Sequence, residues 1–203
     1  MKNKLQKRGF TLIELLIVIG ILAILATATI LVLNPAELFR QARDTTRITD
    51  LDTLRSAIAL YLSTVSSPNM NYAGACGTNY WGTILGATEN FSGSPTQHVN
   101  VGTNSNGTGW VAINFTDIPG GSPLSALPND PINPNTITQS YTYQCNNTAK
   151  TFEINANMES TRYACGGGDD VESTDGGDAN GGVACATPAT AVYEVGNDSG
   201  LDL

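Results

Sequence analysis

The apolar residues of this chain are concentrated in one unbroken run near its N-terminus. Residues 10–33 read FTLIELLIVIGILAILATATILVL and contain a single ionisable side chain, Glu14. As an α-helix this run would be roughly 36 Å long, which is enough to cross a bilayer. A basic cluster precedes it and holds the N-terminus in the cytoplasm, with the remainder outside. The cluster comprises Lys2, Lys4, Lys7 and Arg8.

A second helical pattern covers residues 34–65. Asn34 and Pro35 open it, and because proline lacks a backbone donor, we expect the helix to kink or to start anew there. Downstream, apolar residues recur at spacings of three and four, which predicts an amphipathic helix packed on a head domain. They are Ile48, Leu51, Leu54, Ile58, Tyr61 or Leu62, and Val65.

The rest of the chain has the pattern of loops and short strands. Residues 66–109 are rich in Gly, Asn, Ser and Thr, with Trp81 and Phe91 as isolated candidates for the core. Residues 141–145 and 151–156 alternate around a turn-like Asn-Asn-Thr-Ala, which predicts an antiparallel hairpin. Residues 191–195 are a candidate for a further strand.

Charge and motif content exclude several function classes. The formal net charge is −8, and it would be −12 without the four basic N-terminal residues, so nucleic-acid binding is not expected. The chain has one histidine, His98, and no HExxH, GxSxG, P-loop or paired CxxC motif. We therefore expect neither an enzyme nor a bound cofactor, and we place His98 on the surface.

The four cysteines all lie on the exported side, where disulfides form. Their spacing lacks the paired short intervals of a zinc site, so two disulfides are expected. Of the three connectivities that four cysteines allow, we predict Cys76 with Cys145 and Cys165 with Cys185.

Glu14 decides between three interpretations of the apolar run. A plain membrane anchor would contain no carboxylate, and a secretory signal cleaved near the small-x-small residues 26–28 would not need one. A carboxylate in a membrane helix costs about 3 kcal/mol on insertion scales and is retained for a function. Glu14 therefore favours a third interpretation.

Residues 7–14, KRGFTLIE, resemble the class III signal of type IV prepilins and pseudopilins. The resemblance implies that a membrane-embedded prepilin peptidase cuts between Gly9 and Phe10 and N-methylates Phe10. Such a cut removes the basic cluster and leaves the apolar helix in the membrane. Glu14 then becomes the fifth residue of the product.

The resemblance also implies assembly into a filament through this helix. The new cationic amine of Phe10 can pair with Glu14 of a neighbouring subunit, which offsets the cost of burying both charges. Glu14→Ala or Glu14→Val should then be processed but assemble poorly. Arg43, on a second helix face with Arg40, Arg47, Asp44, Asp50 and Asp52, has two interpretations: a solvated, self-neutralising face, or contact with acidic groups of adjacent subunits or lipid head groups.

Residues 34–61 resemble the extracellular half of the long pilin helix, and parts of the head resemble some bacterial pilins. The implied fold is α+β, with a long N-terminal helix packed on a small antiparallel sheet. The expected organisation is a leader at 1–9, a transmembrane and filament-core helix at 10–33, an amphipathic extension at 34–65 and a loop-rich head at 66–203.

The glycine-rich segment 166–182 contains several acidic residues, and some pseudopilins carry a calcium ion in a comparable late loop. Hard oxygen ligands suit calcium, but the spacing is not that of an EF-hand, so a solvated acidic loop is preferred over a metal site. The candidate ligands are Asp169, Asp170, Asp175 and Asp178.

The function implied is that of a pilin in an extracellular type IV pilus-like filament, made as a single-pass membrane precursor. Its implied partners are identical subunits, prepilin peptidase, an inner-membrane platform protein and an assembly ATPase. Two alternatives stay open: a major pseudopilin of a type II secretion system, and a monomeric anchored or secreted binding module. The processing site separates the second alternative from the other two. Adhesion, motility, DNA uptake and secretion all remain compatible with the sequence.

Overall fold

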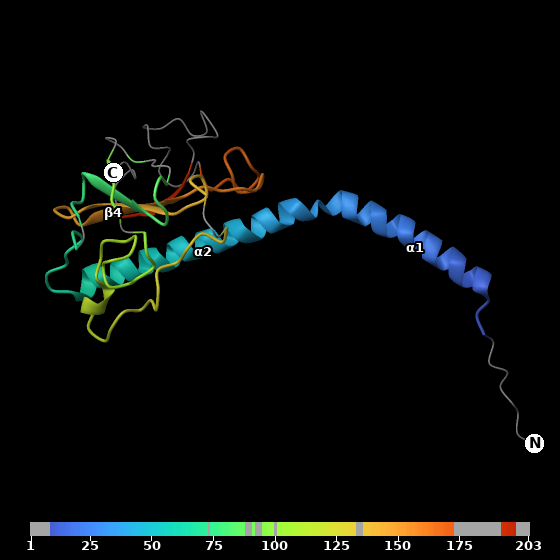
Figure 1. The fold of residues 1–203 in the computed structure, drawn as a ribbon, viewed down its shortest axis with the longest axis horizontal. Helices are drawn as coiled ribbons and strands as arrows, with labels where there is room; N and C mark the ends of the chain where they lie inside the picture. The colour runs from blue at the N-terminus through green and yellow to red at the C-terminus, as the bar shows by residue number, and fades with distance from the viewer. Residues whose placement is uncertain are drawn as a thin grey trace, which may run out of the picture. The chain divides into compact units, whose positions relative to one another are not determined.

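The structure is a computed structural model that describes residues 9–72, 74–87, 91, 95–99, 101–132, 136–172 and 192–197. The chain divides into two compact units, Met1–Phe39 and Arg40–Leu203. The first holds helix α1, Leu12–Leu33, and the second holds most of helix α2, Pro35–Thr64, together with the head (Figure 1). The elements confirm an α+β fold of the pilin type.

Asn34 separates the two helices. Its backbone adopts the left-handed conformation, with φ of 40°, and ends α1. Its carbonyl then accepts hydrogen bonds from the amides of Glu37 and Leu38, which starts α2. Pro35 occupies the first position of α2, where its missing N–H and fixed φ are tolerated. A new helix therefore starts at the Asn-Pro pair.

The head contains a five-stranded sheet in the order β2-β1-β3-β4-β5. The hairpin of β3 (Thr142–Asn146) and β4 (Thr151–Ala156) lies where the alternating pattern predicts it. Strand β5 (Tyr193–Gly196) pairs antiparallel with β4, near the strand expected at 191–195. Strand β1 (Asn79–Gly82) pairs antiparallel with β3.

Strand β2 (Thr96–Gln97) corrects the predicted sheet. It pairs parallel with β1, so the sheet is mixed, whereas the sequence analysis predicts an antiparallel one. Both β1 and β2 lie in the segment expected to be loop-rich. They are too short to produce a readable alternation, and their pairing rests on hydrogen bonds from the amides of Thr96 and His98 to the carbonyls of Thr78 and Tyr80.

The core lies between α2 and one face of the sheet, which lie alongside each other in Figure 1. Helix α2 contributes the predicted apolar face, with Leu51, Leu54, Ile58 and Tyr61 fully buried. Trp81, predicted as a core anchor, is buried against Tyr143. Its ring centroid lies 5.6 Å from that of His98 with the rings tilted, and His98 is half-exposed. A non-strand segment, residues 110–115, adds a buried layer that the sequence analysis did not predict.

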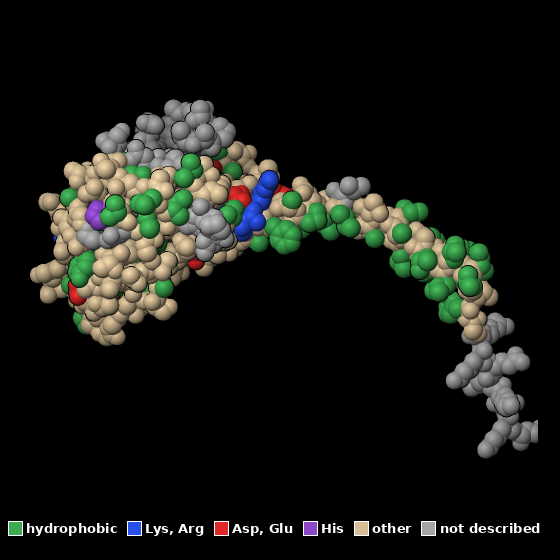
Figure 2. All heavy atoms as spheres, in the orientation of Figure 1, with side chains coloured by type: hydrophobic (Ala, Val, Ile, Leu, Met, Phe, Trp, Pro, Cys, Tyr) green, Lys and Arg blue, Asp and Glu red, His purple; other side chains and the backbone are tan. Residues whose placement is uncertain are grey.

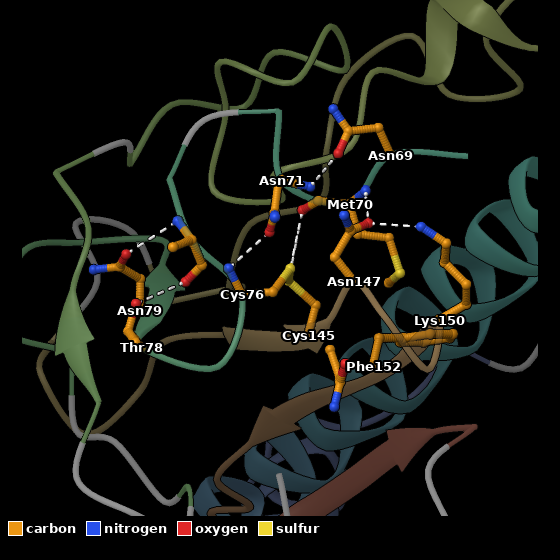
Figure 3. Close-up of a disulfide and its surroundings, with 12 residues drawn as sticks. Asn69, Met70, Asn71, Cys76, Thr78, Asn79, Cys145, Asn147, Lys150 and Phe152 are labelled. Atoms are coloured by element: carbon orange, nitrogen blue, oxygen red, sulfur yellow. Dashed lines mark hydrogen bonds between the residues drawn. A yellow bond between two sulfur atoms is a disulfide. The ribbon is translucent and has the colours of Figure 1, made fainter. Parts of the chain in front are cut away.

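A disulfide joins Cys76 to Cys145 on β3, which is the predicted pairing (Figure 3). It ties the loop before β1 to the sheet. Neighbouring asparagines hold the same loop, because the Asn71 side chain accepts from the Cys76 amide and the Asn147 side chain accepts from the Met70 amide. Cys165 is also disulfide-bonded. Its predicted partner, Cys185, lies outside the described residues.

Candidate functional site

The junction between Gly9 and Phe10 is fully accessible among the described residues. The Phe10 side chain is 89% exposed, and a side chain built on Gly9 would meet nothing within 4 Å. The leader residues before Gly9 lie outside the described residues. An extended, unobstructed backbone is what a protease needs in order to bind a peptide at its cleavage site.

Thr11 and Glu14 form a capping box at the start of α1. The Thr11 amide and hydroxyl donate to one Glu14 carboxylate oxygen at 2.8 and 2.7 Å, and the Glu14 amide donates back to the Thr11 hydroxyl at 3.3 Å. Both partners therefore satisfy groups that a helix start leaves unpaired. The sequence analysis missed this role, although the Thr-x-x-Glu spacing is a recognisable signal for it.

The capping box fixes where α1 begins, one residue after Thr11. The Glu14 carboxylate is consequently held beside the first turn by the backbone amide of Thr11, the residue that follows Phe10. Cleavage after Gly9 would create an amine on Phe10, within the same first-turn region. The structure thus places the charge proposed for assembly next to the processing junction, within one chain.

The helix that follows has the composition of a membrane span. Leu12–Ile30 has a mean hydropathy of 2.6, and none of it is buried within the chain. Figure 2 shows hydrophobic side chains along α1. Exposed apolar area of this extent is stable only in lipid or against another molecule.

Comparison with known proteins assigns the N-terminus. Residues 4–30 match the family described as Prokaryotic N-terminal methylation motif. The chain carries a class III prepilin leader. This is the leader of type IV pilins and pseudopilins, which form a structural family, and it implies processing by a prepilin peptidase and assembly into a pilus-like machinery. No curated protein and no solved structure matches the chain.

The prepilin leader and the apolar helix together fit a membrane-anchored precursor. The match ends within α1 and does not include the head. Within the head, charged residues of α2 form a buried polar cluster with residues of two loops.

Arg47 is the centre of that cluster and is fully buried. Its guanidinium donates to Asp130 at 2.7 and 3.0 Å and to Asp44 at 2.7 Å, and it also pairs with Glu159. Arg43 donates to both carboxylate oxygens of Glu159, at 3.0 and 2.6 Å. The cluster thus links α2 to two loops of the head, at residues 130 and 159.

These contacts revise the two interpretations of the arginine face. The solvated-face interpretation is wrong for Arg47 and Asp44, because both are buried and paired within the chain. Asp44 also accepts hydrogen bonds from the amides of Glu159 and Ser160. Arg43 is bound to Glu159 of its own chain, and its contact with another subunit stays a prediction.

The two described acidic residues that were proposed as calcium ligands have separate partners within the chain. Asp169 pairs with Arg162, and Asp170 accepts a hydrogen bond from the Gly166 amide. Asp175 and Asp178 lie outside the described residues. Among the residues that the structure describes, no three His, Cys, Asp or Glu side chains are grouped so that they could hold a metal ion.

Glu172 lies within the same glycine-rich segment, and its buried carboxylate makes the stability of the head depend on pH. Its carboxylate is buried and accepts hydrogen bonds from the amides of Met158 and Cys165, both at 2.8 Å. Burial raises its pKa to about 7, although these two hydrogen bonds oppose the rise. The folded head therefore binds a proton that the unfolded chain has already released above about pH 4.5.

Since the folded state holds the extra proton, stability should fall by about 2 kcal/mol as the pH rises from 5 to 7. Thermal unfolding of the full chain in detergent, followed at four pH values between 5 and 8, measures this slope. In Glu172→Gln the group does not titrate, so the fall should be absent whatever the absolute stability of the variant. An equal slope in both proteins would contradict the assignment to Glu172.

Proposed function

We propose that this chain is a pilin, the structural subunit of an extracellular type IV pilus-like filament. The observation that carries the proposal is the prepilin leader joined to a helix whose apolar surface is exposed along its whole length. After removal of the leader, the apolar surface of α1 would leave its contacts with lipid and pack against α1 of neighbouring subunits. The head, held by a disulfide and a buried ion cluster, would then face the outside.

In this function the machinery acts on the helix and not on the head. A prepilin peptidase cuts after Gly9 and methylates Phe10, the processed subunit waits in the membrane, and an inner-membrane platform protein driven by a cytoplasmic ATPase lifts it into the filament. The chain itself is not an enzyme in this proposal. Its acidic head surface does not favour nucleic acid.

The intact mass of the non-reduced protein tests the proposal in one measurement. It should be taken from material sheared off the cell surface and from the membrane fraction. A sheared product that begins at methylated Phe10 is the expected result. The same mass also reports how many disulfides the head contains.

The other outcomes each identify a different protein. Methylated product found only in membranes would replace the pilin with a pseudopilin of a type II secretion system or a minor subunit. A product that begins at Thr29, or an uncut chain that keeps residues 1–9, would contradict filament assembly and indicate a secreted or anchored module.

A further inference from the structure

Helix α2 has an exposed face that carries no charge. On the side opposite the buried residues Leu51, Leu54 and Ile58, exposed residues recur at the helical spacings of three and four. None of them is ionisable, although ionisable residues are frequent elsewhere in α2, and Asp52 lies at the margin of this face. The outward face of α2 comprises Thr45, Thr46, Thr49, Thr53, Ser56 and Leu60.

The hydroxyl groups of the outward face are bonded to the helix itself. Thr45, Thr49 and Thr53 donate to the carbonyls four residues earlier, at 2.9, 2.9 and 2.7 Å. Thr46 and Ser56 do the same, at 3.1 and 2.9 Å. Each hydroxyl proton therefore has a partner within the helix, and serine and threonine in this arrangement are compatible with a packed helix–helix contact.

The composition of this face also differs from that of a solvated helix. The side of a surface helix that points to water usually carries charged residues, which favour the helical conformation more than threonine does. A run of threonines there lowers the intrinsic stability of α2 and gives no charged groups to the solvent. Contact with another protein surface accounts for both features.

An open hollow of about 330 Å³ lies at the Leu60 end of the outward face. The Leu60 side chain is 41% exposed there. The described residues that line the hollow come from α2 and from the loop at 123–124, and none of them is ionisable. They are Thr53, Ser56, Ala57, Leu60, Pro123 and Leu124. These residues give no counter-charge to a phosphate or a metal ion, whereas an apolar side chain fits among them.

We propose that the outward face of α2 packs against helix α1 of a second copy of this chain. This inference rests on the proposed function and adds a contact that packing of α1 against α1 does not include. The partner helix is apolar and exposed along Leu12–Ile30, so it has the surface that an uncharged face can cover. Because α2 follows α1 after the single residue Asn34, packing of α1 helices brings the start of each α2 close to α1 of another copy.

The charge of the chain favours the same partner. Without its leader the chain would carry a net charge of −12, so two copies repel each other wherever their carboxylates meet. The outward face has no carboxylate, and α1 has Glu14 alone, in its first turn. Contact between these two surfaces therefore avoids the repulsion that acidic parts of two heads would meet.

Thr53→Glu tests the contact in cells that produce the full chain. It places a carboxylate within the outward face and beside the hollow, so Phe10-methylated subunit in the sheared fraction should fall more than about tenfold. Glutamate favours a helix more than threonine does, so the melting temperature of the chain in detergent should not fall. Processing should be unchanged, because Gly9 and Phe10 are intact.

Two variants control for this change. Thr53→Val keeps the shape of the side chain and removes only a hydroxyl that bonds the Thr49 carbonyl, so it should assemble at the wild-type level. Thr148→Glu adds the same charge at an exposed threonine between β3 and β4, and it should also assemble. Wild-type assembly of Thr53→Glu, or equal losses in the two glutamate variants, would overturn the proposed contact.

Photo-crosslinking identifies the partner. With p-benzoylphenylalanine in place of Leu60, irradiation of sheared filaments should join this position to residues 10–33 of a second copy. Filaments that form but give no such cross-link, or one only to a different protein or to another head, would overturn this contact and leave the pilin function intact. A wild-type chain that never leaves the membrane would contradict the pilin function and the contact together.

Discussion

Replacing Arg47 with methionine should lower the free energy of unfolding of the head by about 3–5 kcal/mol. Arg47 is fully buried and holds Asp44, Asp130 and Glu159 through hydrogen bonds and ion pairs. Removal of its charge takes away the arginine that pairs with Asp44 and Asp130, and leaves Glu159 with Arg43 as its arginine partner among the described residues. Methionine fills much of the vacated volume, so the loss reports uncompensated charge more than a cavity.

Urea unfolding of the full chain in detergent, followed by tryptophan fluorescence, measures this change. Arg162→Met is the matched control. Arg162 pairs with Asp169 at the surface, where both side chains are about half-exposed, and such pairs contribute about 0–1 kcal/mol. Equal losses in the two variants would show that the buried cluster does not stabilise the head.

The same cluster predicts how the head responds to acid. Burial alone would raise the pKa of Glu159, but hydrogen bonds from Arg43 and Arg47 outweigh it and lower that pKa. A carboxyl group whose pKa is lowered by folding stabilises the protein above its unfolded pKa. This contribution should therefore be present above about pH 4.5 and disappear as the pH falls further, and it should be much smaller in Arg47→Met.

Only part of the ion cluster could be predicted from the sequence. Charges three residues apart on a helix are visible in the sequence, and they place Asp44 near Arg47. The decisive partners are remote, since Asp130 is 83 positions from Arg47 and Glu159 is 116 positions from Arg43. Burial of Arg47 depends on those loops, and no local pattern reveals which arginine of a polar face they will cover.

The elements predicted correctly are those whose patterns are long or strictly alternating. The apolar run gives α1, the three-and-four spacing gives the buried face of α2, and alternation gives the β3–β4 hairpin. Strand β2 has two residues and follows no pattern, because pairing with β1 creates it.

The leader is the part of the site that local sequence determines best. The resemblance of residues 7–14 to the class III prepilin signal predicts roles for Gly9, Phe10 and Glu14, and the family match covers the same residues. Glu14 has a hydrogen-bonding role within its own helix, which the capping box shows. Its charged role toward a neighbouring subunit stays a prediction, and the two roles have to be separated.

Glu14→Gln separates these roles and should reduce sheared filaments more than about tenfold while leaving processing intact. Glutamine at the third helical position still fits a capping box, so the start of α1 should be preserved. Its side chain carries no charge, so the methylated amine of a neighbouring Phe10 would be buried in the apolar helix bundle without a counter-ion. Loss of one partner of a buried ion pair costs about 3–5 kcal/mol, which exceeds the 1.4 kcal/mol of a tenfold change.

The measurement compares Phe10-methylated subunit in the membrane and sheared fractions by mass spectrometry. Thr27→Val is the matched control, because the Thr27 hydroxyl bonds only the Ala23 carbonyl of its own helix and carries no charge. That variant should give filaments at the wild-type level, whereas processed Glu14→Gln should accumulate in the membrane. Filaments at the wild-type level from Glu14→Gln would restrict Glu14 to capping, and the uncharged part of α1 would then have to set the register between subunits.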